Sequence, residues 1–117
     1  MISAIHTALS GMTAFTRKIE VTAHNVANVN TDGFKKAHTD FVEVSAGGVE
    51  AIVQQDDSPG SRVPVNSSSG AAQRELSNVN LGEEAVSMIL SQRGFEANLK
   101  VLHTSDHLLG SVLDIKK

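Results

Sequence analysis

Apolar residues in the last third of the chain recur at alternating intervals of four and three, and the polar breaks keep the same register. This seam consists of Leu81, Ala85, Met88, Phe95, Leu99, Leu102, Leu109 and Leu113. An average step of 3.5 residues is typical of a helix that packs lengthwise against another helix. The pattern predicts a helix over residues 81–113, roughly 50 Å long at about 1.5 Å per residue.

A second set of apolar residues lies on another side of the same predicted helix. Its members are Val86, Leu90, Ala97, Val101, Leu108 and Ile115. A helix that is apolar on two sides must be covered on two sides, and one partner helix from the same chain covers only one of them. The second side is therefore predicted to bind other copies or other proteins. The predicted subunit interface consists of Val86, Leu90, Arg93, Gly94, Val101 and Leu108.

Gly94 stands in the middle of the predicted helix, where glycine costs about 1 kcal/mol relative to alanine. It has two interpretations. It is a tolerated surface glycine, or it lets the backbone of another subunit approach closely, with Arg93 paired across that contact.

The first 27 residues repeat the same spacing, with apolar positions from Ile2 to Val26 and one polar position at Thr16. They predict a second helix, over residues 2–27 and roughly 40 Å long. The two helices are expected to run out and back and to pair along their seams. The predicted intrachain seam consists of Leu9, Met12, Ile19, Met88, Phe95, Leu99 and Leu102.

The chain between the two predicted helices divides into three segments of different composition. An asparagine-rich stretch over residues 25–34 ends in Gly33-Phe34 and predicts a helix stop and a structured turn. Residues 41–53 read as two short strands around Gly47-Gly48, and residues 56–74, rich in Ser, Gly and Pro, as an extended mobile connector. Asn80 is placed to cap the second helix, with Glu83 as in a capping box.

The expected fold is therefore mainly α, with two long antiparallel terminal helices forming a coiled-coil hairpin that carries a small β-hairpin and loop insert. Residues 1–34 form one half of the paired-helix domain and residues 77–117 the other half. Residues 35–76 form the insert.

Composition narrows the class of protein further. The chain of 117 residues has no Trp or Tyr and only four Phe, so a thick aromatic core is not expected. Its net charge of −3 gives no electrostatic footprint for nucleic acid, and the absence of cysteine excludes thiol chemistry. No window is long and apolar enough for a membrane span. The N-terminus shows no signal peptide, so a protein leaving the cytoplasm would need a dedicated export route.

Two constellations imitate metal sites. Asn28, Asn30, Asp32 and Gly33 match the opening of an EF-hand loop, but its twelfth position is Thr39, where a bidentate Glu is required. His103 and His107 are one helical turn apart, without the third ligand that a zinc site needs. No serine sits in a nucleophile elbow and no glycine-rich loop has phosphate-binding spacing. The sequence predicts no enzyme activity, no metal and no cofactor.

Both ends of the chain resemble the bacterial flagellar axial proteins, the rod and hook family. At the N-terminus the resemblance rests on Ala8-Leu-Ser-Gly-Met12 and on Asn25-Val-Ala-Asn28-Val-Asn30-Thr-Asp-Gly33-Phe34. At the C-terminus it rests on Ser77-Asn-Val-Asn80-Leu and on Gln92-Arg-Gly-Phe95-Glu-Ala-Asn98. The motif residues singled out are Asn25, Asn28, Thr31, Gly33, Phe34, Ser77, Asn78, Val79, Gln92 and Asn98.

The resemblance implies a structural subunit of the basal-body rod, whose terminal helices pair and whose copies stack into a hollow tube that transmits torque. It implies copies of the same chain and other rod and hook proteins as partners, and export through the flagellar type III apparatus without a cleaved signal peptide. The small insert is most like that of the proximal rod proteins, while the wording around Gln92 is closer to distal rod and hook members. A short rod-like paralogue or a member with a trimmed outer domain also fits.

A second class of protein stays open from the residues alone. A helical hairpin that docks a single partner, such as an adaptor or an export chaperone, would also carry a helix with two apolar sides. Stoichiometry separates the two classes, because a binding module saturates at one partner while an axial subunit adds without limit.

Overall fold

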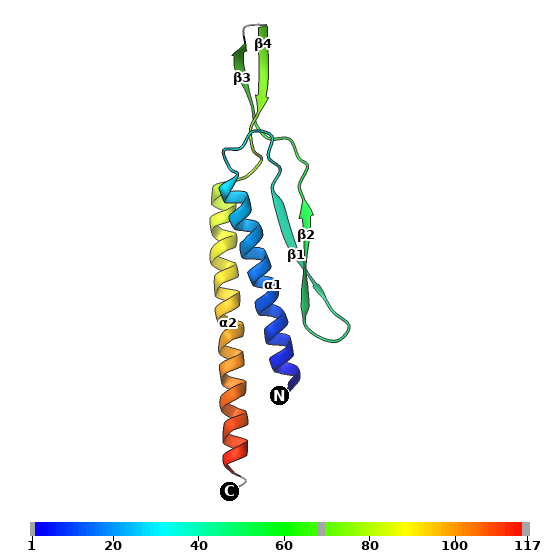
Figure 1. Cartoon of the computed structure of the whole chain (residues 1–117), viewed down its shortest axis with the longest axis vertical. Coiled ribbons are helices and arrows are strands. Elements are labelled where there is room, and N and C mark those ends of the chain that lie inside the picture. The colour runs from blue at the N-terminus through cyan, green and yellow to red at the C-terminus, as the bar shows by residue number, and fades with distance from the viewer. Residues whose placement is uncertain (1, 68–69, 116–117) are drawn as a thin grey trace.

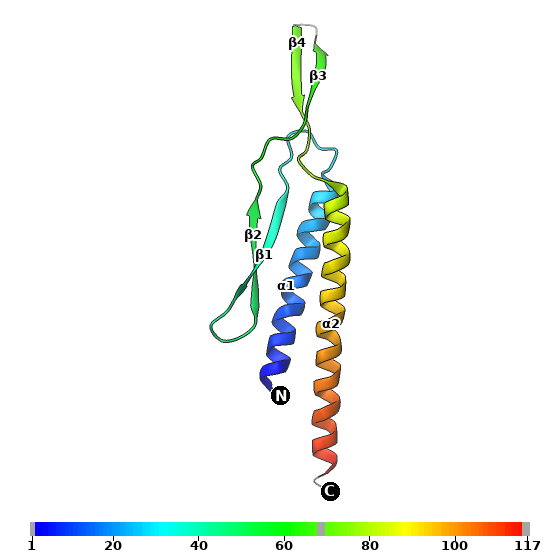
Figure 2. The same cartoon turned by 180° about the vertical axis from the view of Figure 1, so that it is seen from behind.

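Two long helices and two β-hairpins make up the computed structural model, which describes residues 2–67 and 70–115. Helix α1 (Ile2–Ala27) and helix α2 (Leu81–Asp114) run antiparallel and side by side in both views (Figures 1 and 2). The molecule is elongated, with extents of 84 × 25 × 15 Å. The predicted helices and the mainly α fold are confirmed.

Strands β1 (Ala37–Glu43) and β2 (Val49–Gln55) form an antiparallel hairpin that lies along α1. The predicted turn at the Gly47-Gly48 pair is confirmed, since both glycines have positive φ, +88° and +98°. At Gly48 a side chain would overlap Ser10 of α1, and the Ser10 hydroxyl accepts a hydrogen bond from the Val49 amide at 3.2 Å. Ser10 thus attaches the tip of the hairpin to the helix.

The prediction of a mobile connector over residues 56–74 is wrong for most of that segment. Strands β3 (Arg62–Ser67) and β4 (Gly70–Glu75) form a second antiparallel hairpin that projects beyond the helices (Figure 1). Val63 and Val65 alternate with polar residues, which is the period of a strand, but the Ser- and Gly-rich composition around them hid that short signal. Pro64 is tolerated because each strand has a free edge.

The contact between the helices is made by smaller and more polar side chains than the apolar seam predicted. Glu84, Ser91, Asn98 and Ser105 recur every seven residues on α2, and all but Asn98 are less than 9% exposed. Opposite them lie Gly11, whose missing side chain leaves room for Asn98, and Thr22, whose hydroxyl is 3.4 Å from that of Ser87. Small side chains let the two helices approach closely.

The seam prediction is wrong for two of its members, Leu9 and Leu99. Leu9 is 52% exposed and Leu99 is 37% exposed, so neither belongs to the buried contact. The other five members of the predicted seam are half-buried: Met12, Ile19, Met88, Phe95 and Leu102. The physical reason is that apolar spacing gives the period of a helix face, while the side facing the partner is set by where small residues permit close approach.

Candidate functional site

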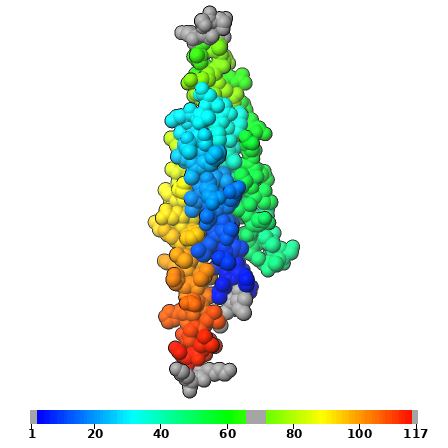
Figure 3. Space-filling view, viewed as in Figure 1, coloured from blue at the N-terminus to red at the C-terminus, as the bar shows by residue number. Residues whose placement is uncertain are grey.

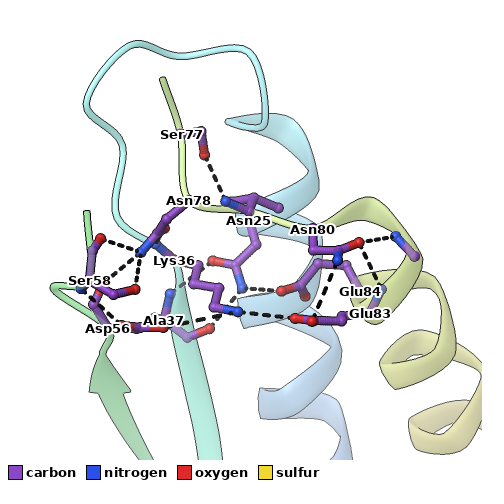
Figure 4. A network of polar contacts seen from close by, with 12 residues as sticks. Asn25, Lys36, Ala37, Asp56, Ser58, Ser77, Asn78, Asn80, Glu83 and Glu84 are labelled. Atoms are coloured by element: carbon purple, nitrogen blue, oxygen red, sulfur yellow. Dashed lines mark hydrogen bonds and ion pairs between the residues drawn. The ribbon is translucent and has the colours of Figure 1, made fainter. Parts of the chain in front are cut away.

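The junction where both helices meet the hairpins is organised by Asn25, which is 1% exposed. Its side-chain oxygen accepts a hydrogen bond from the Ala37 amide at 3.0 Å. Its side-chain nitrogen donates to the Ala37 carbonyl at 2.7 Å and to the Glu84 carboxylate at 3.0 Å. One asparagine therefore joins the end of α1, the start of β1 and the first turn of α2 (Figure 4).

Asn78 joins the segment before α2 to the two segments that flank the first hairpin. Its side-chain oxygen accepts from the Lys36 amide at 2.7 Å, and its nitrogen donates to the carbonyls of Asp56 and Ser58 at 2.8 and 3.0 Å (Figure 4). The adjacent Ser77 hydroxyl accepts from the Val79 amide at 3.2 Å. These bonds hold the segment that enters α2 against the segments on either side of the first hairpin.

The start of α2 is capped at the same place. The Asn80 side-chain oxygen accepts from the Gly82 and Glu83 amides at 2.9 and 3.4 Å, so the predicted N-cap is confirmed. The Glu83 carboxylate lies 3.1 Å from Lys36 Nζ, and Asp56 lies 4.0 Å from the same nitrogen. The cap of α2 is therefore tied by charge to the chain that leads into β1.

The asparagine-rich turn uses the spacing that imitates a calcium loop. The Thr31 hydroxyl donates to the Asn28 side chain at 3.2 Å, and Gly33 has φ +66°, a conformation that glycine adopts freely. Asp32 is 3.3 Å from Arg74. Residues 37–39, the end of the EF-hand-like spacing, lie in β1. The segment is a structured turn, and the ring of Phe34 meets that of His24 edge-on at 5.4 Å.

The motif residues Gln92 and Asn98 lie apart from this junction, in the middle of α2. Gln92 donates to the Glu96 side chain at 3.1 Å, and Asn98 donates to the Gly94 carbonyl at 2.9 Å while facing Gly11. The structure thus brings the N-terminal motif and Ser77, Asn78 and Val79 together, and places the last motif at the helix contact. Sequence reasoning missed the roles of Lys36, Glu75 and Glu84, which bond to Asn78, Gly33 and Asn25 of the motifs but have no distinctive spacing.

The predicted subunit interface is only partly exposed. Val86, Leu90, Val101 and Leu108 are 46–61% exposed along α2. The prediction that Gly94 lies at a contact between subunits is wrong. A side chain at Gly94 would overlap the Phe15 ring of α1, so its close contact lies within the chain. Arg93 pairs with Glu96 on its own helix at 2.9 Å. The term "outer ridge" is used below for Val86, Leu90, Val101 and Leu108.

Sites for chemistry are scarce in the part of the chain that the structure describes. Over residues 2–67 and 70–115, no three His, Cys, Asp or Glu side chains come together in a metal-binding group. His103 and His107 are exposed on α2. No helix among the described residues is long and apolar enough to span a membrane. What the molecule offers instead is the polar junction and the exposed apolar ridge.

Two carboxylates at the base of the second hairpin have lowered pKa values. Hydrogen bonds from Ser58 lower the pKa of Asp56, and the Lys35 side chain, followed by the Gly60 amide, lowers that of Glu75. Lys35 Nζ lies 2.6 Å from Glu75, whose carboxylate accepts from Gly60 at 2.9 Å. A carboxyl whose pKa is lower when folded stabilises the fold above its unfolded pKa, and this stabilisation is lost as pH falls through the folded value.

Acidification below about pH 4 is therefore expected to loosen the base of the β3–β4 hairpin before the helices melt. Amide hydrogen exchange across a pH titration, corrected for intrinsic exchange, would show protection at Gly60 falling first. Glu75→Gln is the control, since its neutral side chain should make Gly60 protection less dependent on pH in this range, with Asp56 alone still titrating. Simultaneous loss of protection in α1 and α2 would contradict the expectation.

Two long antiparallel helices, a polar junction between them and an exposed apolar ridge define an elongated protein of the paired-helix class. Residues 5–35 match the family model "Flagella basal body rod protein", and residues 69–115 match "Flagellar basal body rod FlgEFG protein C-terminal". The chain is 32% identical to the flagellar basal-body rod protein FlgC of Borreliella burgdorferi, over an alignment covering 98% of this chain and 97% of that protein.

Shorter matches join the chain to larger relatives. It is 46% identical over 43 residues to the flagellar basal-body rod protein FlgG of Borreliella burgdorferi, and 38% identical over 63 residues to that of Caulobacter vibrioides. These alignments cover 37% and 54% of this chain, and only 16% and 24% of the relatives. The chain belongs to the flagellar basal-body rod protein family. It is a structural protein of the basal body and not an enzyme.

Proposed function

We propose that this chain is a rod subunit that assembles with its own copies, and with other rod and hook proteins, into a helical axial tube that transmits torque. The observation that carries the proposal is the outer ridge of α2, four large apolar side chains that are each 46–61% exposed. Fully burying one such side chain contributes about 1.5–3 kcal/mol, so covering the ridge would strongly favour association. The full-length likeness to a rod protein supports the same assignment.

The shape of the molecule suits a mechanical role. The paired helices lie along the 84 Å axis of the molecule, and Asn25 and Asn78 attach the first hairpin to their ends by buried or half-buried hydrogen bonds. The second hairpin is attached at Glu75, whose carbonyl accepts from the Gly33 amide and whose carboxylate pairs with Lys35. A rod built from such units would resist bending and twisting, because hydrogen bonds hold the segments between the two helices against the helix ends. Export through the flagellar type III apparatus is part of the proposal, supported by the family resemblance.

Charge placed on the outer ridge is expected to abolish assembly without unfolding the chain. The double variant Val86→Asp with Leu90→Asp introduces two carboxylates where apolar burial is proposed, while both positions are exposed in the single chain. Sedimentation velocity over a concentration series, with electron microscopy of the concentrated samples, should show growing assemblies for the parent chain and none for the variant. Circular dichroism should report the same helix content for both.

Ala85→Asp is the matched control, since Ala85 is exposed on the same turn but on another side of α2. It should assemble like the parent chain. A parent chain that stays monomeric at high concentration and saturates with one partner molecule would refute the rod proposal. It would favour the helical-hairpin binding module instead.

A further inference from the structure

A shallow groove runs along α1 on the side of the first hairpin. Its widest part, a hollow of about 520 Å³, is lined mainly by Leu9, Thr13 and Ala14 of α1 and by Val49 and Ala51 of β2. Two adjoining hollows of about 330 and 380 Å³ continue it along α1. Figure 3 shows α1 with α2 on one flank and the hairpin on the other.

The groove and the outer ridge are similar in length, and each exposes apolar side chains. The groove follows α1 from His6 to His24, roughly 27 Å at the rise of a helix, and the ridge from Val86 to Leu108 spans roughly 33 Å. Leu9 at 52% exposed shows that the groove floor is open, as the ridge is. Within the single chain both surfaces face solvent.

The groove and the α2 surface also carry side chains of opposite charge. Glu50 lines the groove at β2, and no ion pair of Glu50 occurs within the described residues. Arg17 and Glu20 of α1 also line the groove, but these two side chains are paired with each other at 3.0 Å. On α2, Lys100 precedes Val101 and lies on one flank of the outer ridge, since consecutive residues of a helix point in different directions. Its side chain is exposed, and no ion pair of Lys100 occurs within the described residues. The groove therefore carries an open carboxylate at Glu50, and the flank of the outer ridge carries an open ammonium group at Lys100.

We infer that the groove between α1 and β2 receives the outer ridge of a second copy of this chain, with Glu50 of one copy against Lys100 of the other. The inference rests on the proposed function, of which it names the acceptor surface. Ridge and groove are different surfaces of one chain, so the contact is heterologous: each copy that donates its ridge keeps its groove free. Such a contact does not end at two copies as an isologous dimer does: it gives a ring where the rotation between copies closes and a filament or helical tube where it does not.

Crosslinking of full-length chains tests the contact directly, because the sequence has no cysteine. Copies carrying Thr13→Cys in the groove are mixed with copies carrying Ala97→Cys on the exposed ridge side of α2. The mixture should form disulfide-linked dimers of one copy of each kind under mild oxidation. Thr13→Cys mixed with Gln92→Cys, which lies on another side of α2, is the control and should form few.

Charge exchange supplies the second measurement. Lys100→Glu alone and Glu50→Lys alone are each expected to raise the concentration for half-maximal assembly about tenfold, because each places like charges across the contact. The chain carrying both substitutions should return to within about threefold of the parent.

The outcomes separate the two proposals. If the parent chain assembles but the Thr13–Ala97 crosslink is absent and charge reversal has no effect, the groove contact is overturned while the rod assignment stands. If the parent chain never assembles, both fall. A crosslink that forms together with rescue in the double charge variant supports both.

Discussion

Replacing Asn25 with leucine should destabilise the folded chain by at least about 3 kcal/mol. The leucine has the same branching of side-chain heavy atoms but leaves the Ala37 amide, the Ala37 carbonyl and the Glu84 carboxylate without the bonds that Asn25 makes. Each buried polar group left unsatisfied costs about 1–3 kcal/mol. Asn25 is 1% exposed, so water cannot replace it without opening the junction. Urea unfolding followed by circular dichroism would measure the change.

Asn30→Leu is the matched control, because Asn30 is an exposed residue of the same turn. Surface changes of this kind stay within about 0.5 kcal/mol. Equal losses for the two variants would show that the asparagine-rich segment matters for its composition and not for the bonds of Asn25. Asn25→Asp is informative in addition, since it keeps the acceptor for Ala37 but sets a second carboxylate against Glu84.

Gly94→Leu is expected to destabilise the pairing of the two helices by roughly 1–3 kcal/mol through overpacking. A side chain at residue 94 would overlap the Phe15 ring, which packs edge-on against Phe41 at 5.0 Å between ring centres. The ring can yield only by disturbing the contact of α1 with the first hairpin. The free energy of unfolding in urea is again the measurement, and the loss should exceed the helix-propensity gain from replacing glycine.

Gly110→Leu makes the same chemical change in the same helix, at a position where an added Cβ would meet no other side chain within 4 Å. It should be neutral or stabilising by up to about 1 kcal/mol. Adding Phe15→Ala to Gly94→Leu should recover part of the loss if the overlap is its cause. A Gly94→Leu chain as stable as the Gly110→Leu chain would contradict the close packing of Phe15 on α2.

Both predictions concern residues that lie in the motifs shared with rod and hook proteins, and the structure gives each motif a physical role. Asn25 and Asn78 close the junction, Ser10 fixes the hairpin tip, and Gly11 and Gly94 admit Asn98 and Phe15 at the helix contact. These positions set the geometry of the unit, while the apolar ridge is left for assembly. Because the motif residues and the outer ridge are different side chains, the chain can be held rigid by the motifs while the ridge stays exposed for contact with other subunits.

The sequence alone determined the two helices, the first hairpin, the Asn80 cap and the family. Local signals carry these features, because apolar period, turn glycines and a capping asparagine act within a few residues of one another. It also identified an apolar surface in excess of what one partner helix can cover. The second hairpin escaped because its strands are six residues each and sit in Ser- and Gly-rich surroundings.

Only the tertiary structure decided which side of α2 meets α1. The leucine-rich spacing favoured Leu9 and Leu99, but the contact is made where Gly11, Ser91 and Gly94 allow the backbones to approach. The tertiary structure also places Gly94 against Phe15 of the same chain. It brings the Glu84 carboxylate, 59 residues away in sequence, to the side-chain nitrogen of Asn25. Period fixes how often a face recurs along a helix, whereas the choice of face depends on the shape of a partner distant in the chain.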